Sequence, residues 1–356
     1  MNRRRAWQAG AASVIVVGAA VAFVVVTRGS SAAPLLAFTT TRDANAEVYV
    51  VDARGGSLRD LSNALGQDGQ PAWSPDGSRI AFTSARDGNG EIYVMNADGS
   101  GQRRLTRSPD LADTAPVWSP DGRTLADMCT RANPFVTQIC VVEADGLNPR
   151  RLTGLGHDDN LFPVWSPDGT EILYSSARPQ THGSYAIYAV SPTGGAERRV
   201  TIDLAGAGEP AYSPDGTRLA FIGREAQAGS TWALYIADAN GANARRISHV
   251  DGRVDAPTWS PDGSNLAFEC LGACSGGARR SDIYAIDASG GSLHRLTVAV
   301  GTNLDPRFSP DGRLIVFTRL LGHRSDVLTV GVNGAGLRNL TPGSGQNGSP
   351  AWHPAG

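Results

Sequence analysis

The chain has 356 residues, with 32 basic and 34 acidic side chains, a formal net charge of −2 and a sequence pI near 6.3. This balance gives no electrostatic sign of nucleic-acid binding. Lysine is absent, which excludes catalysis by a lysine nucleophile or Schiff base. Forty-three glycines and 21 prolines, in a chain that is 19% charged, indicate a turn-rich β protein rather than a disordered one.

The N-terminal segment predicts one hydrophobic helix. Arg3 to Arg5 precede an uncharged run from Ala9 to Val26. As a helix this run spans about 27 Å, close to the roughly 30 Å hydrocarbon core of a bilayer. We interpret residues 1–33 as a signal anchor with a short linker, and a cleaved signal peptide is the alternative. The positive-inside rule then exports residues 34–356, which are either held at the cell membrane by a single pass or secreted or periplasmic after cleavage.

A repeated sequence follows this leader. The string Ser-Pro-Asp-Gly occurs six times, at steps of 45, 47, 47, 47 and 49 residues, and such a period is typical of repeat architectures. The copies begin at Ser74, Ser119, Ser166, Ser213, Ser260 and Ser309. The string predicts a turn, because proline presets φ, aspartate bonds the local backbone and glycine accepts a positive φ.

Each repeat predicts four short antiparallel strands. In the second unit they are Gln70–Trp73, Arg79–Ser84, Glu91–Met95 and Gln102–Thr106, separated by turns rich in Asp, Asn and Gly. Four strands in about 45 residues make one blade of a β-propeller. Aromatic residues recur at fixed positions of the first three strands. We interpret them as wedges between blades, each contributing roughly 2–3 kcal/mol of stability.

The two ends of the chain predict how the ring closes. The first unit has second, third and fourth strands, starting at Leu35, but no first strand. Pro350–Trp352, in contrast, is a first strand without a unit of its own. We therefore expect an all-β, seven-bladed propeller of four-stranded antiparallel blades over residues 34–356. The C-terminal strand closes it by pairing with the first blade, which removes two open sheet edges.

Arginines recur on the predicted outermost strands, as in Arg103-Arg104 and Arg150-Arg151. We interpret them as charges that block pairing at an exposed sheet edge rather than as a nucleic-acid surface.

The four cysteines form two local pairs. Cys129 and Cys140 lie on the second and third strands of one blade, on the same face, and Cys270 and Cys274 share one loop. Two disulfides are expected in an oxidising compartment. A metal site is disfavoured, because no paired histidines stand at ligand spacing.

The pattern Pro-x-Trp-Ser-Pro-Asp-Gly-x-x-Ile/Leu-Ala-Phe, followed by Ile-Tyr and Arg-Arg-Leu-Thr, resembles the WD40-like (PD40) repeat of the TolB propeller. The resemblance extends from about Leu35 to Gly356. TolB-like repeats occur in periplasmic binding proteins, in prolyl oligopeptidase-type peptidases and in some polysaccharide lyases. About 34 residues precede the first blade, too few for the α/β domain of TolB, and the Gly-x-Ser-x-Gly elbow of hydrolases is absent. Asp127 breaks the repeat where other blades have Phe, and we expect it to be surface-turned or hydrogen-bonded.

Binding residues are expected on the face that carries the long second-to-third-strand loops and the blade connections. If the first strand is innermost, acidic and amide side chains of the connections rim the central channel and are candidates for holding a cation, a sugar or a basic peptide. The alternative is that they cap turns. The candidates are Asp68, Asp113, His157, Asp159, Asn160, Glu209, Asp255, Asn303 and Asp305.

These patterns predict an exported, membrane-tethered propeller that serves as a binding module or scaffold at the cell envelope. A protein partner is favoured, and a carbohydrate or another envelope ligand is the alternative. The membrane contact is the N-terminal helix; neither a nucleic-acid partner nor a cofactor is expected. The alternative function is a hydrolase or polysaccharide lyase with its site at the loop-rich channel mouth. Enzymatic activity is the second choice, because no catalytic constellation is recognised.

Overall fold

The computed structural model describes residues 33–154, 158–178, 184–201, 204–227, 230–272, 274, 277–298, 301–343 and 345–354. The expected N-terminal helix and the rim candidate His157 lie outside the described residues. Within the described ranges, no helix has the length and apolar character needed to cross a membrane.

Seven four-stranded antiparallel sheets, called blades 1 to 7 below, form the unit from Ala33 to Gly356. Blade 1 consists of β28 (Asn347–Trp352), β1 (Leu35–Thr40), β2 (Glu47–Asp52) and β3 (Arg59–Asp60). Blade 2 consists of β4 (Asp68–Trp73), β5 (Arg79–Ser84), β6 (Glu91–Asn96) and β7 (Arg103–Arg104). Blade 3 consists of β8 (Leu111–Trp118), β9 (Thr124–Ala132), β10 (Phe135–Glu143) and β11 (Arg150–Arg151). Blade 4 consists of β12 (Asn160–Trp165), β13 (Ile172–Ala177), β14 (Tyr185–Val190) and β15 (Arg198–Arg199).

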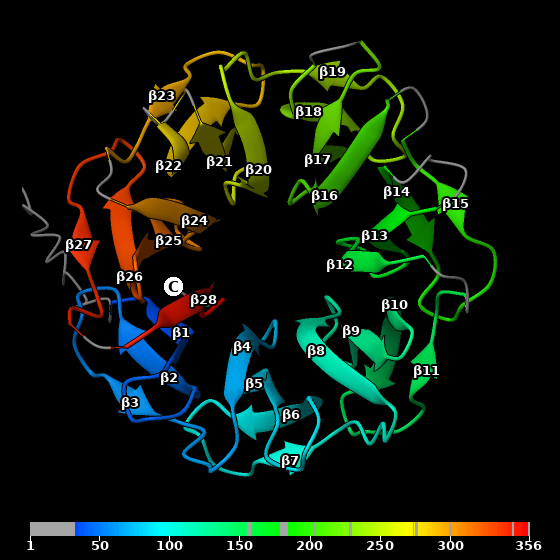
Figure 1. Cartoon of the computed structure of the whole chain (residues 1–356), viewed down its shortest axis with the longest axis vertical. Helices are drawn as coiled ribbons and strands as arrows, with labels where there is room; N and C mark the ends of the chain where they lie inside the picture. The colour runs from blue at the N-terminus through cyan, green and yellow to red at the C-terminus, as the bar shows by residue number, and fades with distance from the viewer. Residues whose placement is uncertain are drawn as a thin grey trace, which may run out of the picture. The chain divides into compact units, whose positions relative to one another are not determined.

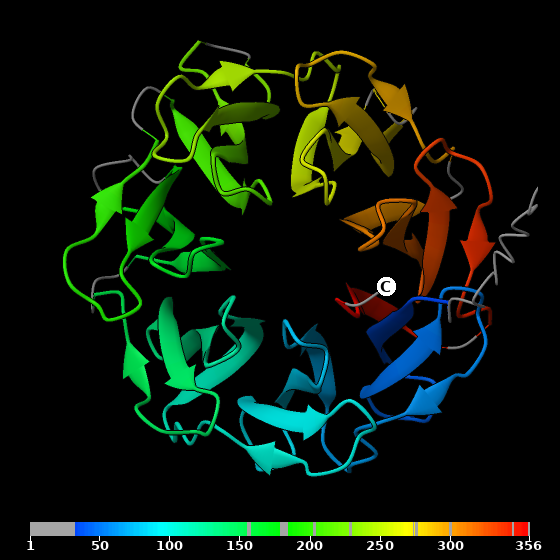
Figure 2. The ribbon, with the colours of Figure 1, turned by 180° about the vertical axis from the view of Figure 1, so that it is seen from behind.

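Blade 5 consists of β16 (Gly206–Tyr212), β17 (Arg218–Arg224), β18 (Ala233–Asp238) and β19 (Arg245–Arg246). Blade 6 consists of β20 (Arg253–Trp259), β21 (Asn265–Gly272), β22 (Gly277–Asp287) and β23 (His294–Arg295). Blade 7 consists of β24 (Thr302–Phe308), β25 (Leu314–Leu321), β26 (Arg324–Gly331) and β27 (Arg338–Asn339). In this unit the blades form a ring around a central channel, with the first strand of each blade innermost and the fourth outermost (Figures 1 and 2). The predicted seven-bladed, all-β architecture is confirmed.

The C-terminal strand completes blade 1, as the two incomplete ends of the repeat predict. β28 runs antiparallel to β1, with Ala351 opposite Ala37 and Asn347 opposite Thr40. The His353 amide then donates to the Leu35 carbonyl at 2.9 Å, which continues the pairing beyond the strand. One blade therefore contains both ends of the propeller sequence.

The Ser-Pro-Asp-Gly strings are tight structural turns between the first and second strands. In blade 2 the Gly77 amide donates to the Ser74 carbonyl at 2.8 Å, and Gly77 has a φ of 69°. The Ser74 hydroxyl donates to the Asp76 carboxylate at 2.6 Å, and that carboxylate accepts the Ser78 amide at 3.0 Å. Ser74, Asp76 and Gly77 thus each contribute to the hydrogen bonding or backbone conformation of the turn.

The recurring aromatic residues pack between blades, as expected. Six second-strand aromatics have no exposed surface: Phe38, Phe82, Tyr174, Phe221, Phe268 and Phe317. The tryptophan at the end of a first strand also bonds backward to the preceding blade; for example, Trp118 Nε1 donates to the Ala72 carbonyl at 3.0 Å. Aromatic burial and this indole hydrogen bond hold neighbouring blades at a fixed spacing.

The outer-strand arginines form hydrogen bonds to neighbouring blades. An arginine at the first position of the fourth strand reaches the turn between the third and fourth strands of the next blade. Arg150 donates to the Pro192 carbonyl at 2.7 Å, Arg245 donates to the Ser289 carbonyl at 3.1 Å, and Arg338 donates to the Arg54 carbonyl at 2.9 Å. These side chains therefore link neighbouring blades by hydrogen bonds along the outer edge of the ring.

Deleting residues 349–356 is expected to open the ring. The lost ladder bonds, at about 1 kcal/mol each, and the lost Trp352 packing predict a loss of more than about 3 kcal/mol in unfolding free energy, together with aggregation through the exposed β1 edge. Urea denaturation and light scattering measure both effects. The control is removal of 355–356 alone, which leaves β28 intact. Equal unfolding curves for the two truncations would contradict closure by β28.

Candidate functional site

Four of the predicted rim residues lie beneath the rim rather than on it. They stand three residues before the proline of their blade, and each is at most 2% exposed: Asp68, Asp113, Asn160 and Asn303. The expectation that these side chains line the channel is therefore wrong. The innermost strand alternates between the channel and the blade interior, and this position faces the interior.

A repeated hydrogen-bond network explains this burial. Between blades 6 and 7, Asn303 Nδ2 donates to Asp282 at 3.0 Å, Thr297 Oγ1 donates to the same carboxylate at 2.8 Å, and the Ile283 amide donates to Thr297 Oγ1 at 3.0 Å. Between blades 4 and 5, apolar Ala186 and Ala207 take the acid and amide positions, and both are buried. Of these two interfaces between blades, one therefore contains both polar partners and the other contains neither, as the burial of polar groups requires.

The channel wall is formed instead by the residue directly before each proline. In all seven blades this residue has a φ of 50–59° and coincides with a shift in strand register. The residues are Gln70, Ala115, Phe162, Glu209, Ala256, Asp305 and Ser349. A left-handed conformation at non-glycine residues is uncommon, and its recurrence makes it part of the architecture. The bulge places these seven side chains at the channel cavities.

The side chain after the second-strand aromatic stabilises the bulge of the next blade. Thr39 Oγ1 accepts the Gln70 amide at 3.0 Å, and Ser175 Oγ accepts the Glu209 amide at 3.0 Å. In blade 6 this position is Glu269, whose carboxyl accepts the Asp305 amide at 2.7 Å. A carboxyl therefore replaces a small hydroxyl at this part of the channel.

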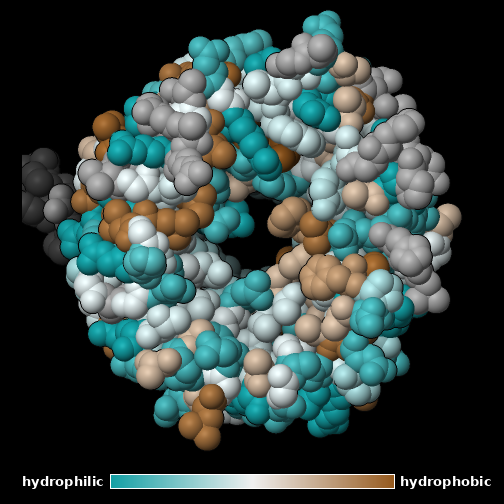
Figure 3. Space-filling view, in the orientation of Figure 1, coloured by the Kyte–Doolittle hydropathy of each residue, from teal (hydrophilic) through white to brown (hydrophobic). Residues whose placement is uncertain are grey.

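The largest described channel cavity, of about 720 Å³, has an acidic wall, defined as Glu209, Asp255, Glu269 and Asp305. Glu209 Oε2 accepts the Ala256 amide at 2.5 Å, and Asp255 forms an ion pair with Arg253 at 2.8 Å. Apolar residues complete the lining, among them Phe162, Pro163, Pro210, Pro257 and Trp259. Figure 3 shows the open hollow, with hydrophobic residues bordering it beside β12.

The four carboxyl groups of the acidic wall are only partly balanced by arginine, since Arg253 pairs with Asp255 and Arg307 also lines the cavity. Burial, and then the neighbouring charges of Asp305, Asp255 and Glu209, raise the pKa of Glu269 to about 8. Burial is also the main cause that raises the pKa of Glu209 and of Asp255. Because a nearby cation favours ionised carboxylates, a positively charged ligand in this cavity would displace the proton of Glu269.

Of the nine predicted rim residues, the structure brings Glu209, Asp255 and Asp305 together at the channel. Asp159 instead accepts the Thr137 amide at 3.0 Å, which secures β10. Sequence reasoning missed Glu269 and Phe162. The signal for Glu269 was available, since it stands where other units have residues such as Thr39, Thr83 or Ser175. Among the described residues, no group of three His, Cys, Asp or Glu side chains is placed to hold a metal ion.

Both expected disulfides are present, Cys129–Cys140 within blade 3 and Cys270–Cys274 at the β21–β22 connection. The first lies beside Asp127, which is 1% exposed and, among the described residues, has no hydrogen-bond partner on either oxygen. The expectation of a surface or hydrogen-bonded aspartate is therefore wrong. Burial, and then the charges of Asp113 and Glu91, raise its pKa well above the usual value.

Comparison with known proteins places this geometry in a family. The PD40 family model, described as the TolB beta propeller domain, matches residues 28–112, 110–229 and 207–356, so the sequence resemblance is confirmed. No functionally curated protein matches the sequence.

Solved structures share the propeller. TolB from Acinetobacter baumannii is 19% identical with a TM-score of 0.57, and the match covers 90% of this chain and 66% of that chain. A structure assigned to TolB of Agrobacterium tumefaciens is 26% identical with a TM-score of 0.54, with 69% of this chain and 86% of that chain covered. Oligogalacturonate lyase from Vibrio parahaemolyticus is 16% identical with a TM-score of 0.61, with 87% and 86% covered. Peptidase structures are among the other matches.

The buried carboxyl of Asp127 predicts a stability that falls with pH. A folded-state pKa above the unfolded value means that the folded form holds its proton while the unfolded form releases it, so stability is lost as pH rises from about 4. Asp127→Asn should therefore be more stable than the wild type by at least about 2 kcal/mol at pH 8 and nearly equal to it at pH 4. Urea denaturation at both values measures this. Asp110→Asn, at an exposed carboxyl, is the control, and an equal effect of both substitutions would refute the assignment.

Proposed function

Since the chain belongs to the PD40 family of TolB β-propeller domains, we propose that it is an exported binding module that holds a basic segment of a protein partner at the acidic wall of its channel. The TolB-like propeller fold indicates a binding module, although hydrolases and lyases share the fold. The export proposal is supported by Arg3 to Arg5 and the following apolar run, and by two disulfides, which are typical of oxidising compartments. The proposed location is the cell envelope.

The observation that carries the proposal is the convergence of four carboxyl groups on one apolar cavity. Glu209 and Asp305 come from bulges of blades 5 and 7, and Asp255 and Glu269 come from blade 6. A cavity of about 720 Å³ is large enough for several side chains. Prolines and Phe162, which is 48% exposed, suit the apolar part of such a segment, and the carboxyl groups suit its lysine or arginine side chains.

Glu269 also favours a second candidate function, a lyase or hydrolase. A carboxyl with a pKa of about 8 beside a cavity has the property expected of a general acid or base. The test is the formation of unsaturated products from oligogalacturonate, followed by ultraviolet absorbance. Turnover that is lost in Glu269→Gln would favour the lyase.

Peptide binding tests the primary proposal. A Pro-Lys-Leu-Lys-Pro-amide peptide labelled with fluorescein at its N-terminus should bind the full-length chain at pH 8. The Glu209→Gln/Asp305→Asn double variant should weaken binding at least tenfold, because both charges facing the peptide are lost while the Gln retains the acceptor for the Ala256 amide. Fluorescence anisotropy measures this. Asp98→Asn/Asp110→Asn removes the same charge from exposed turns as a control.

The pH dependence gives an independent readout of the same site. Since Glu269 gains a negative charge as pH rises through about 8, peptide affinity should increase between pH 7 and 9. Glu269→Gln should remove this increase. Equal affinity of the double variant and its control, or a pH profile unchanged by Glu269→Gln, would contradict the proposal.

A further inference from the structure

The Ser-Pro-Asp-Gly turns of neighbouring blades enclose a recurring slot where the innermost strand of each blade ends. Between blades 2 and 3, Arg79 fills it. Its guanidinium lies 4.7 Å from the ring centroid of Trp118, and Nη2 donates to the Gly122 carbonyl at 3.0 Å. Between blades 5 and 6, Arg218 lies 4.7 Å from the Trp259 centroid and donates to the Gly263 carbonyl at 2.7 Å.

A histidine fills the corresponding slot between blades 1 and 2. The His353 ring meets Trp73 edge-on, with ring centroids 4.6 Å apart, and its Nε2 lies 3.2 Å from the Gly77 carbonyl oxygen. These three slots share one recognition pattern: a nitrogen-rich planar group contacts an aromatic ring and the carbonyl of the turn glycine. Three slots of this chain therefore bind a side chain of the same chemical type.

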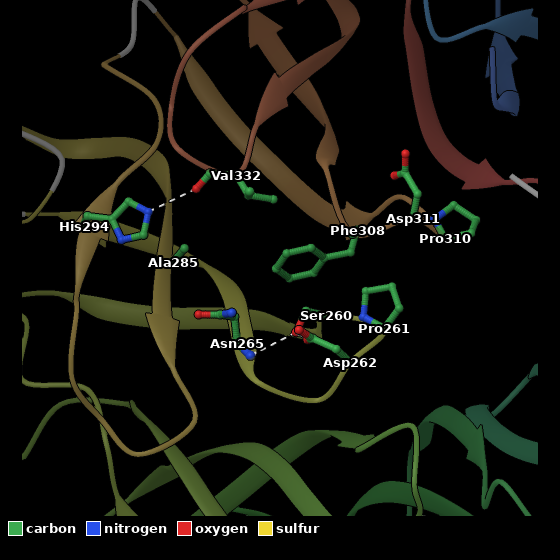
Figure 4. Close-up of a pocket in the computed structure, with 11 residues that line it drawn as sticks. Ser260, Pro261, Asp262, Asn265, Ala285, His294, Phe308, Pro310, Asp311 and Val332 are labelled. Carbon is green, nitrogen blue, oxygen red and sulfur yellow. Dashed lines mark hydrogen bonds between the residues drawn. The ribbon is translucent and has the colours of Figure 1, made fainter. Parts of the chain in front are cut away.

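The slot between blades 6 and 7 has the same walls but is open. Phe308 takes the tryptophan position and Asn265 takes the arginine position, and a cavity of about 270 Å³ lies between them. Figure 4 shows the Phe308 ring in this cavity, with Asn265 and His294 at its margin. Asn265 Nδ2 donates to Ser264 Oγ at 2.7 Å, so this side chain is engaged within its own turn.

The other side chains around this slot are held in place. The ring nitrogens of His294 lie 2.8 Å from the Ser292 carbonyl and 3.1 Å from the Val332 carbonyl. A Cβ built on Gly312 would meet Pro261 at 3.5 Å, whereas one built on Gly263 would meet Nη2 of Arg218 at 3.4 Å. The turn glycines of the slots filled by arginine also have a proline edge, with Pro214 3.7 Å from the Cβ built on Gly263, so the open slot differs in lacking the guanidinium.

Charge in the open slot matches a cation. Hydrogen bonds from Ser74 and Ser78, and then the charge of Arg79, lower the pKa of Asp76 in a filled slot to about 2. Hydrogen bonds from Ser260 and Ser264 are the main causes that lower the pKa of Asp262, which lines the open slot with Asp311, to about 2. The open slot thus has the carboxylate of the slots filled by Arg79 and Arg218, but with Asn265 in place of their guanidinium.

We propose that the slot between blades 6 and 7 binds the guanidinium group of an arginine in a partner polypeptide other than this chain. Guanidinium is planar, stacks on an aromatic face and donates in its own plane, which an ammonium does not do. The slot between blades 4 and 5 differs, because Glu171 at the arginine position is already paired with Arg198 at 2.9 Å. The proposed site is independent of the acidic wall.

Short peptides test the chemistry directly. Saturation-transfer NMR on the full-length chain should detect acetyl-Gly-Arg-Gly-amide with a dissociation constant on the order of 1 mM. The citrulline and lysine equivalents should bind at least fivefold more weakly, since the first lacks the charge and the second lacks the planar fork. Equal binding of the arginine and citrulline peptides would overturn the proposal.

Three variants locate the site. Asn265→Arg should fill the slot as Arg79 and Arg218 fill theirs, and reduce peptide binding at least tenfold, whereas Asn265→Gln should leave it unchanged. Arg218→Asn should open the slot over Trp259 and add a second site of similar affinity. Circular dichroism checks that each variant is folded. Unchanged binding in Asn265→Arg would refute the site, and concentration-dependent self-association that this variant abolishes would identify a second copy of the chain and refute the choice of partner.

Discussion

The ring depends on the pairing of β28 with β1, because this pairing joins the two ends of the propeller sequence in one blade. The C-terminal strand connects three blades. It pairs with β1 in blade 1, its Ala351 carbonyl accepts Trp73 Nε1 of blade 2 at 3.2 Å, and Trp352 Nε1 donates to the Arg307 carbonyl of blade 7 at 3.1 Å. Once the ring is closed, every blade packs between two neighbours. This explains why a large ring recurs at the same buried second-strand position in six blades.

Closure also makes departures from the repeat informative. Some departures are balanced, as when Ala186 and Ala207 together replace a polar pair, and these preserve packing without adding chemistry. Others are unbalanced: Asp127 replaces an aromatic ring, Glu269 replaces a hydroxyl, and Phe308 with Asn265 replaces a tryptophan and an arginine. Unbalanced departures leave charge or space that the fold itself does not use, and the two proposed binding sites are of this kind.

The sequence predicted the repeat, the turns, the ring closure and both disulfides, because these depend on local patterns and on spacing. It did not predict which connection residues reach the channel. A bulge before each proline changes the register of the innermost strand, and a one-residue change reverses which face a side chain occupies. Asp68 and Asn303 are therefore buried, whereas Glu209 and Asp305 line the channel. Predicting that Glu269 lies at the channel would have required knowing that this second-strand side chain reaches the bulge of the next blade.

An engineered crosslink tests the closed ring most directly. Ala37 and Ala351 are directly opposed in β1 and β28, and opposed residues of antiparallel strands lie within the Cα separation that a disulfide requires. The Ala37→Cys/Ala351→Cys variant, oxidised and digested with a protease, should yield an intramolecular peptide pair joining the two positions by mass spectrometry. Free thiols at both positions, or crosslinks only between molecules, would contradict the closed ring and the channel built on it.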